Sequence, residues 1–523
     1  MKIETNSLPS DPEKLKQMLL ELQKTVAVKN KELIKKDKII TDQAIQINQF
    51  IERYEIAKRK QFGKSSEQNP GEDETFNEAE ETLDEADKTL LAEVGSKKTP
   101  TIKNKPKRKP LPKNLPRKVI TIDLSVDEQV CDCCQSSLHK IGESRSEKLE
   151  FVPAHIKVIE TIRPKYACKQ CEKTGTANHI KTAPMPPTPI PKGIATASLL
   201  SQLITAKYQY GLPLYRQESM FNDYGISLSR QTMSDWLMRC SELLMPLYDV
   251  FKSQLLAQAV IHADETPLKV IREEKTTSYM WVYCCGEDKL NNNKTKNIVL
   301  YDYHNSRAAQ CPILFLDGYS HYLQVDGYAA YGKTDAILAG CMAHARRKFI
   351  DAKTAQGKNK TGKADVVLSL IGKLYGIESN IKTKTSDEKH QVRQGKSKPI
   401  LDKINTWVTN NKEKIPPKSK LGEALTYWHN QAHKLETYLK DGRINIDNNR
   451  AERAVKPFVI GRKNWLFSNT SRGANASAIL YSFIETAKAN GLLVDSYLQT
   501  CLNELAKKPE SLEYLLPWNI KQG

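Results

Sequence analysis

Apolar residues in the first sixty positions recur with the period of a helix. Alternating steps of three and four from Leu19 to Ala57 visit twelve positions, nine of them apolar, and no proline or glycine lies between these two residues. A narrow apolar stripe surrounded by charged and polar residues is typical of a coiled coil. We therefore predict a coiled-coil helix over residues 11–66 that joins copies of the chain. An amphipathic helix packed on its own chain is the alternative.

Two oppositely charged blocks follow this helix, and neither has the apolar residues that a core needs. Residues 67–93 hold eleven acidic residues and one lysine, and residues 97–118 hold ten basic residues and five prolines. Such composition predicts an unstructured linker over residues 67–118. The basic block either adds nonspecific affinity for DNA or serves only as a solvated tether.

Short β-like runs then occupy residues 119–181, and residues 193–258 have a helical pattern throughout. Within the helical stretch, residues 214–238 have the pattern helix, turn, helix, with Ser229 placed to cap the second helix. A helix-turn-helix DNA-binding motif has this pattern, although many buried pairs of helices share it.

From Ala259 onward the apolar pattern becomes that of strands. Runs rich in β-branched and aromatic residues predict four strands, at residues 260–263, 279–283, 298–301 and 322–325. A helix is predicted between the third and fourth strands, at residues 306–316. This order predicts a mixed sheet with helices on its faces. We predict a multidomain α/β chain: a core over residues 259–490 with a helical insertion at about residues 345–440, then a helical tail over residues 491–523.

Charge and cysteine content narrow the class of protein. The 523 residues carry a formal net charge of +19, which suits a polyanionic partner such as DNA, although a merely soluble basic protein shares this balance. No apolar span is long enough for a membrane helix, and the first ten residues are too polar for a secretory signal. The eleven cysteines, an odd number, favour a reducing cytosol over a disulfide framework.

Two cysteine pairs have the spacing of zinc knuckles. Cys131 and Cys134 form the first pair, and Cys168 and Cys171 form the second. In a protein that is not secreted, four thiolates of this kind can close a tetrahedron around Zn²⁺. We predict a structural zinc in residues 119–181. A redox CxxC motif is the rival, although no thioredoxin-like pattern surrounds either pair.

Three acidic residues suggest a metal-dependent active site. Asp264 and Asp326 each follow a strand pattern, and Glu452 lies in a helix-favouring stretch that Asn448 or Asn449 can cap. If the two strands are neighbours, Mg²⁺ between the carboxylates would relieve their repulsion. A third acid completes a site for two ions about 4 Å apart, as used in phosphoryl transfer. Each acid alone is explained more simply as a turn residue or a surface charge.

Further polar residues surround these acids in the sequence. Cys341 and His344 form a C-x-x-H group, which is either half of a metal site or a short structural element beside the active site; we favour the structural element. Basic residues near this group and near Glu452 are candidate contacts for DNA phosphates, or they merely balance helix charge: Arg346, Arg347, Lys348, Arg453 and Lys456.

Several strings of this sequence, taken in order, resemble the large transposase of the IS66 family of bacterial insertion sequences. They lie at residues 62–67, 163–168, 263–267, 326–331, 343–349, 448–453 and 515–518. The resemblance covers nearly the whole chain. One departure occurs in the first knuckle, where Asp132, Cys133 and Gln135 stand in a turn that more usually holds proline and glycine.

The resemblance implies a DDE transposase with an RNase H-like core, in which Asp264, Asp326 and Glu452 are catalytic and bind Mg²⁺ or Mn²⁺. Such an enzyme binds the terminal inverted repeats of its element, cuts DNA there and joins the freed 3′-hydroxyls to target DNA. The resemblance also implies small accessory proteins as partners and a cytoplasmic, nucleoid-associated location. Two alternatives remain open: a zinc-dependent DNA-binding regulator with an inert core, and an RNase H-like nuclease.

Overall fold

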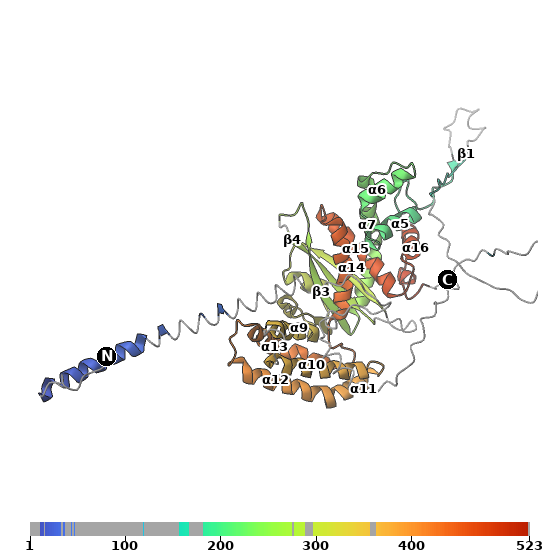
Figure 1. The fold of residues 1–523 in the computed structure, drawn as a ribbon. Coiled ribbons are helices and arrows are strands. Elements are labelled where there is room, and N and C mark those ends of the chain that lie inside the picture. The colour runs from blue at the N-terminus through green and yellow to red at the C-terminus, as the bar shows by residue number, and fades with distance from the viewer. Residues whose placement is uncertain are drawn as a thin grey trace, which may run out of the picture. The chain divides into compact units, whose positions relative to one another are not determined.

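The computed structural model describes residues 181–520 except 275–276, 288–295 and 356–361, residues 156–166, and a set nearer the N-terminus: 11–14, 16–32, 35, 36, 43, 46, 47 and 119 (Figure 1). The chain divides into two compact units, Ser96–Pro184 and the remainder. The predicted linker at residues 67–118 and the four zinc-knuckle cysteines lie outside the described residues.

The N-terminal helix and the β-like runs are confirmed only in part. Residues 12–14 and 16–32 are helical and exposed, as the coiled-coil pattern requires, while pairing with a second copy stays a prediction. In the smaller unit, strand β1 (Lys165–Tyr166) pairs antiparallel with strand β2 (Lys181–Thr182).

The predicted helix, turn and helix after residue 193 are present. Helix α5 (Ala197–Tyr208) precedes α6 (Leu214–Asp223) and α7 (Arg230–Leu256), and the Ser229 hydroxyl accepts a hydrogen bond from the Thr232 amide, as predicted for a cap. Much of α7 is buried: Tyr248 donates a hydrogen bond to the Tyr301 carbonyl, and Phe251 packs on Phe483. These helices therefore share one hydrophobic core with the sheet that follows.

The sheet contains the four predicted strands and one more. Its order is β5-β4-β3-β6-β7, with antiparallel pairing among β3, β4 and β5 and parallel pairing of β3 with β6 and of β6 with β7. The strands span Val260–Lys269 (β3), Thr277–Cys285 (β4), Ile298–His304 (β5), Tyr322–Val325 (β6) and Ile337–Gly340 (β7). Strand β7 was not predicted because its four residues include alanine and glycine and give no alternating pattern. The short helices α8 (Gln310–Phe315) and η3 (Ala329–Lys333) flank β6 in the sequence.

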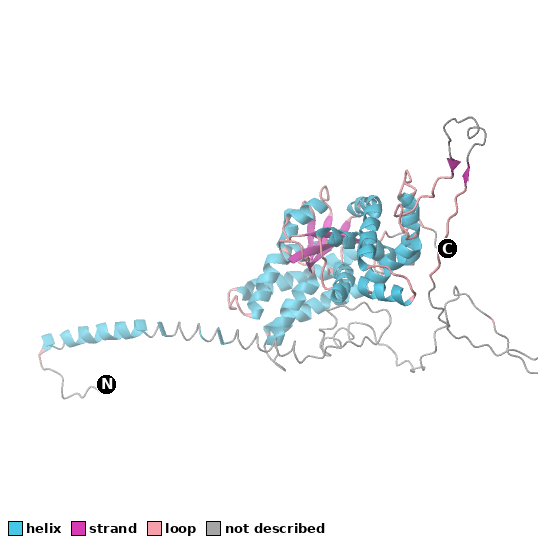
Figure 2. Ribbon diagram, turned by 90° about the horizontal axis from the view of Figure 1, so that it is seen from above, coloured by secondary structure: helices cyan, strands magenta, loops and turns pink. Residues whose placement is uncertain are grey.

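Helices surround the sheet (Figure 2). Helix α15 (Ser471–Ala489) covers the edge strand β5, and its hydroxyls take the place of a neighbouring strand: Ser482 accepts from the Tyr301 amide, and Thr486 accepts from the Val299 amide. Helix α14 (Asn449–Trp465) packs on β3 and β4. The predicted C-terminal helices are α16 (Val494–Ala506), which packs on α5, and the single turn η6 (Glu513–Leu515).

The predicted helical insertion has a hydrophobic core of its own. It is built from α9 (Met342–Ala355), α10 (Lys363–Asn380), α11 (Ser386–Val392), η4 (Arg393–Ser397), α12 (Lys398–Lys412), α13 (Lys420–Leu435) and η5 (Thr437–Leu439). Ala339 of β7 and Met342 belong to this second core, whereas Val325 of β6 belongs to the core of the sheet. The two cores therefore meet where β6 and β7 end.

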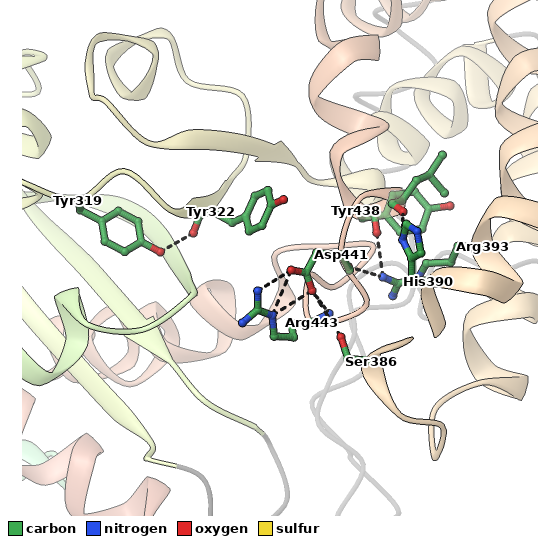
Figure 3. Close-up of polar contacts among 9 residues, drawn as sticks. Tyr319, Tyr322, Ser386, His390, Arg393, Tyr438, Asp441 and Arg443 are labelled. Carbon is green, nitrogen blue, oxygen red and sulfur yellow. Dashed lines mark hydrogen bonds and ion pairs between the residues drawn. The ribbon is translucent and has the colours of Figure 1, made fainter. Parts of the chain in front are cut away.

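Polar contacts fix the segment that leads from the insertion back to α14, residues 438–448, which we call the return segment (Figure 3). Buried Arg393 donates hydrogen bonds to the carbonyls of Tyr438 (2.9 Å) and Asp441 (3.0 Å) and pairs with Glu378 at 2.7 Å. The Nδ1 atom of His390 lies 2.9 Å from the Leu439 carbonyl. These contacts bind the first residues of the return segment to α11 and η4 of the insertion.

Candidate active site

The register of the parallel strands brings three polar residues to one edge of the sheet. His262 of β3 is paired with Gln324 of β6, and Asp264 and Asp326 come two residues later in the sequence. Asp326 follows β6 as predicted, but Asp264 lies within β3, because this strand continues to Lys269 through its pairing with β4. Val325 of β6 is paired with Gly340 of β7, so Cys341 stands level with Asp326. Because the carboxyl ends of parallel strands meet at the same edge, these residues lie side by side across β3, β6 and β7.

Asp264 is the most strongly perturbed acid of this edge. Burial raises its pKa well above the ordinary carboxylate value, and the negative charges of Glu265, Asp326 and Glu452 raise it further, while the Glu265 amide lowers it by donating to Oδ1 at 2.8 Å. The charges of Asp326 and Glu452 thus both repel a negative charge on Asp264. Removing that repulsion requires a proton or a cation.

Asp326 lies in a sharp turn held by the insertion. Its Oδ1 accepts a hydrogen bond from the Tyr328 amide at 2.9 Å, and its carbonyl accepts one from the Tyr427 hydroxyl of α13 at 2.8 Å. The next residue, Gly327, has a φ of +106°, a conformation that L side chains rarely adopt. A Cβ at this position would also stand 3.2 Å from the Tyr427 hydroxyl. The turn therefore requires glycine, and α13 fixes its position.

Glu452 reaches the same place from the first turn of α14, through Asn448. The fully buried Asn448 side chain donates to the Ala263 carbonyl of β3 (2.9 Å) and contacts His262 Nδ1 (3.1 Å). Its carbonyl accepts from the Glu452 amide at 3.3 Å. Asn448 is thus the N-cap residue by position, but its side chain does not cap the helix as predicted. It joins the helix of Glu452 to the strand of Asp264 instead.

The C-x-x-H group lies directly beside Glu452. Cys341 follows β7, His344 lies in the first turn of α9, and His344 Nδ1 is 3.5 Å from Glu452 Oε1. One ligand atom from each of Cys341, His344 and Glu452 lies within 4.8 Å of the others. Burial raises the pKa of the Cys341 thiol, and the charge of Asp447 adds to that effect, whereas the Asn448 amide, which donates to Sγ at 3.2 Å, lowers it.

Sequence reasoning missed several residues at this site. Glu265 is buried and accepts hydrogen bonds from Tyr331 (2.6 Å) and Arg307 (2.5 Å). Arg307 also stacks on the ring of Tyr328, 3.9 Å from its centroid. Burial lowers the pKa of Lys434 in α13, and the charge of Asp326 opposes this. The only sequence signal was that Glu265 adjoins Asp264; Arg307 and Lys434 come from distant segments.

The predicted DNA-contacting residues have different surroundings. A contact with DNA phosphates requires an exposed side chain, and Arg346 does not meet this requirement. The residue is only 4% exposed and lies in the buried stripe of α9 with Met342, Ala345 and Phe349. Lys348 and Lys456 are exposed, and Arg347 and Arg453 are half-buried. Lys456 lies one turn beyond Glu452 on the same face of α14.

Comparison with protein families decides the class. The family model for "Transposase IS66 family" matches residues 192–476, more than half of the chain. The chain belongs to the IS66 transposase family. Other parts of this transposase match "Transposase C of IS166 homeodomain" at residues 49–120, "zinc-finger binding domain of transposase IS66" at residues 128–172, and "IS66 C-terminal element" at residues 482–518.

Curated relatives of this IS66-family transposase extend over most of its length. Protein y4jD of Sinorhizobium fredii is 34% identical over 79% of this chain and 81% of its own. Protein y4hP of the same organism is 31% identical over 83% of this chain and 81% of its own. Both are described as uncharacterized proteins. No solved structure matches the chain.

Family membership supports one of the predicted features in outline. The zinc-finger match spans all four knuckle cysteines and supports a structural zinc in this IS66-family transposase, while the assignment of Cys131, Cys134, Cys168 and Cys171 as ligands stays a prediction. Among the described residues, no helix has the length and apolar character needed to cross a membrane.

Proposed function

We propose that this protein is a DDE transposase that cuts DNA at the ends of its insertion sequence and joins the freed 3′-hydroxyls to target DNA. The observation that supports the proposal is the placement of Asp264 and Asp326 by the neighbouring strands β3 and β6, where the charges of Asp326 and Glu452 both act on Asp264. The middle of strand β3, the residue after strand β6 and the first turn of helix α14 supply them. We assign the sheet to the RNase H-like class, because three antiparallel strands are extended by two parallel ones on the side that carries the acids.

The residues present fit divalent metal ions. All three donors are carboxylates, which Mg²⁺ and Mn²⁺ prefer. Burial raises the pKa of Asp264, and the charges of the neighbouring acids raise it further, so a cation beside this carboxylate is favourable. Bound ions of this kind supply activation of the attacking oxygen and stabilisation of the leaving oxygen. Asp264, Asp326 and Glu452 would hold them.

The remaining residues of the site bind and orient the DNA. Lys434, placed near Asp326 by α13, and Lys456, on the Glu452 face of α14, provide positive charge for the phosphates next to the cut bond. Arg347, Lys348 and Arg453 extend this basic surface. The ion pair between the exposed Arg307 and the buried Glu265 side chain fixes the loop between β5 and α8 beside the acids.

Recognition of the element's terminal inverted repeats belongs, in this proposal, to the parts outside the acidic site. The zinc module and the α6–α7 pair supply DNA-binding surfaces, and the N-terminal helix joins copies of the protein so that two ends are held together. Small accessory proteins of the same element are further proposed partners. The net charge of +19 supports DNA as the common partner.

The decisive experiment replaces each acid singly with its amide: Asp264→Asn, Asp326→Asn and Glu452→Gln. With Mg²⁺ and labelled end DNA, each variant should bind the DNA as the unchanged protein does but cleave and join it at least about 10²–10³-fold more slowly. Asp317→Asn, at an exposed aspartate away from the acids, is the matched control and should cleave normally.

Each contrary result identifies a different error. If one variant still cleaves the DNA, the residue replaced in it is not one of the catalytic acids. Binding without any cleavage by the unchanged protein would favour an inert regulator, and cleavage without joining would favour a nuclease.

A further inference from the structure

We propose that Cys341, His344 and Glu452 form a binding site for a transition-metal ion, and that Zn²⁺ is the ion that fits these donors best. The inference rests on the proposed function in one respect: it gives the catalytic Glu452 a second ligand set beside the one it shares with Asp264 and Asp326. The sequence analysis placed Cys341 and His344 beside the active site, but it did not predict that they contact Glu452, because more than one hundred positions separate His344 from Glu452.

The geometry of the three donors supports a single ion. One Sγ, one ring nitrogen and one carboxylate oxygen lie within 4.8 Å of one another, and each comes from a different place: the end of β7, the first turn of α9 and the first turn of α14. Three protein ligands with one open position are a common arrangement for Zn²⁺ outside purely structural sites. The C-x-x-H group is therefore half of a metal site after all, completed by an acid rather than by a second cysteine pair.

A fixed surrounding shell holds two of the donors in place. The Asn448 amide donates to Cys341 Sγ at 3.2 Å, and the Asn448 carbonyl accepts from the Glu452 amide at 3.3 Å. The Asn448 side chain is itself fixed by the Ala263 carbonyl and His262. Hydrogen bonds of this kind, made by a neighbouring residue to the metal ligands, orient the ligands of a metal site.

Donor chemistry separates this site from a magnesium site. Thiolate and imidazole favour Zn²⁺ and related transition metals, whereas Mg²⁺ prefers oxygen. Because Glu452 belongs to both ligand sets, Zn²⁺ bound to Cys341 and His344 would withdraw this carboxylate from the catalytic ions. The structure thus provides a place where Zn²⁺ would inhibit Mg²⁺-dependent cleavage.

The test measures metal binding directly, on the full-length protein. Samples are dialysed against a zinc buffer, and bound zinc per chain is determined by mass spectrometry. Cys341→Ser and His344→Asn should each lose one equivalent relative to the unchanged protein, with affinity at this site weakened at least about 100-fold. Cys311→Ser, a buried free cysteine elsewhere, and His433→Asn, an exposed histidine of α13, are the matched controls and should lose none.

Three features keep the result interpretable. Cys341 is fully buried, so if Cys341→Ser fails to fold by circular dichroism, His344→Asn decides, because the His344 side chain is 26% exposed. Cys168→Ser removes zinc of the knuckle module and should add to the loss rather than replace it. Full zinc content in folded His344→Asn overturns the site. Cleavage by the amide variants of the three acids would overturn the proposed function while leaving this zinc measurement untouched.

Discussion

At the scale of single residues, Asp264 shows the conflict between stability and function. Its carboxylate is buried among three others, and both burial and the neighbouring charges raise its pKa. The folded protein therefore holds the Asp264 proton more tightly than the unfolded chain does. Ionisation of Asp264 therefore lowers the free energy of unfolding. This loss is absent at pH values below the ordinary pKa of a carboxylate, and it grows as the pH rises through that pKa.

Asp264→Asn should therefore stabilise the metal-free protein near neutral pH, by about 1 kcal/mol, while it abolishes cleavage. Thermal unfolding in a chelator measures the first effect, and the advantage of the variant should shrink as the pH is lowered toward 4. Mg²⁺ should raise the melting temperature of the unchanged protein but not that of the variant. If the variant melts at a lower temperature than the unchanged protein in chelator, the ionised Asp264 carboxylate does not destabilise the fold.

At the scale of elements, the insertion positions the site from two sides. Helix α13 holds the Asp326 turn through Tyr427, and the η4 segment holds the return segment through Arg393. The acids thus depend on a helical subdomain that contributes none of the three carboxylates. The insertion is therefore needed to position the acids, although it supplies none of them.

Arg393→Ala should destabilise the insertion by roughly 3–5 kcal/mol, because it leaves Glu378 and two carbonyls without their buried partner. Arg443→Ala is the matched control in the same region: its pair with Asp441 involves an arginine side chain that is 56% exposed, so it should cost less than about 1 kcal/mol. Chemical denaturation followed by far-ultraviolet circular dichroism measures both. Equal losses would show that the buried pair does not anchor the return segment.

At the scale of the whole molecule, charge is distributed unevenly along the chain. The basic block at residues 97–118 holds ten of the 80 lysines and arginines, next to an acidic block that offsets them. The block lies in a different part of the chain from the three acids. Its proposed contribution is to affinity for DNA rather than to catalysis.

Replacing the ten basic residues of this block with glutamine should weaken nonspecific DNA binding and make its dependence on salt shallower, because fewer counterions are released. Binding isotherms at several salt concentrations provide the slope. Single-turnover cleavage of DNA that is already bound should keep its rate. An unchanged slope would identify the block as a solvated tether.

The sequence by itself determined what depends on local pattern and on chemical type. Strand periodicity located β3 to β6, the Ser229 cap and its helix were read correctly, and the residue types and context identified Asp264, Asp326 and Glu452 as candidates. These features could be predicted because a period of two, a hydroxyl before a helix and the chemical type of a side chain are each local properties of the sequence. The family was predicted from ordered strings along the chain and is confirmed.

Only the tertiary structure decided which residues meet. It added strand β7, placed Arg346 in a buried position, brought Lys434 to the acids, and placed Glu452 beside Cys341 and His344. None of these could be predicted, because periodicity indicates which face of an element is buried but not which element covers it. The pairing register of β3, β6 and β7 and the Asn448 contacts across nearly two hundred residues supply that information, and both are long-range.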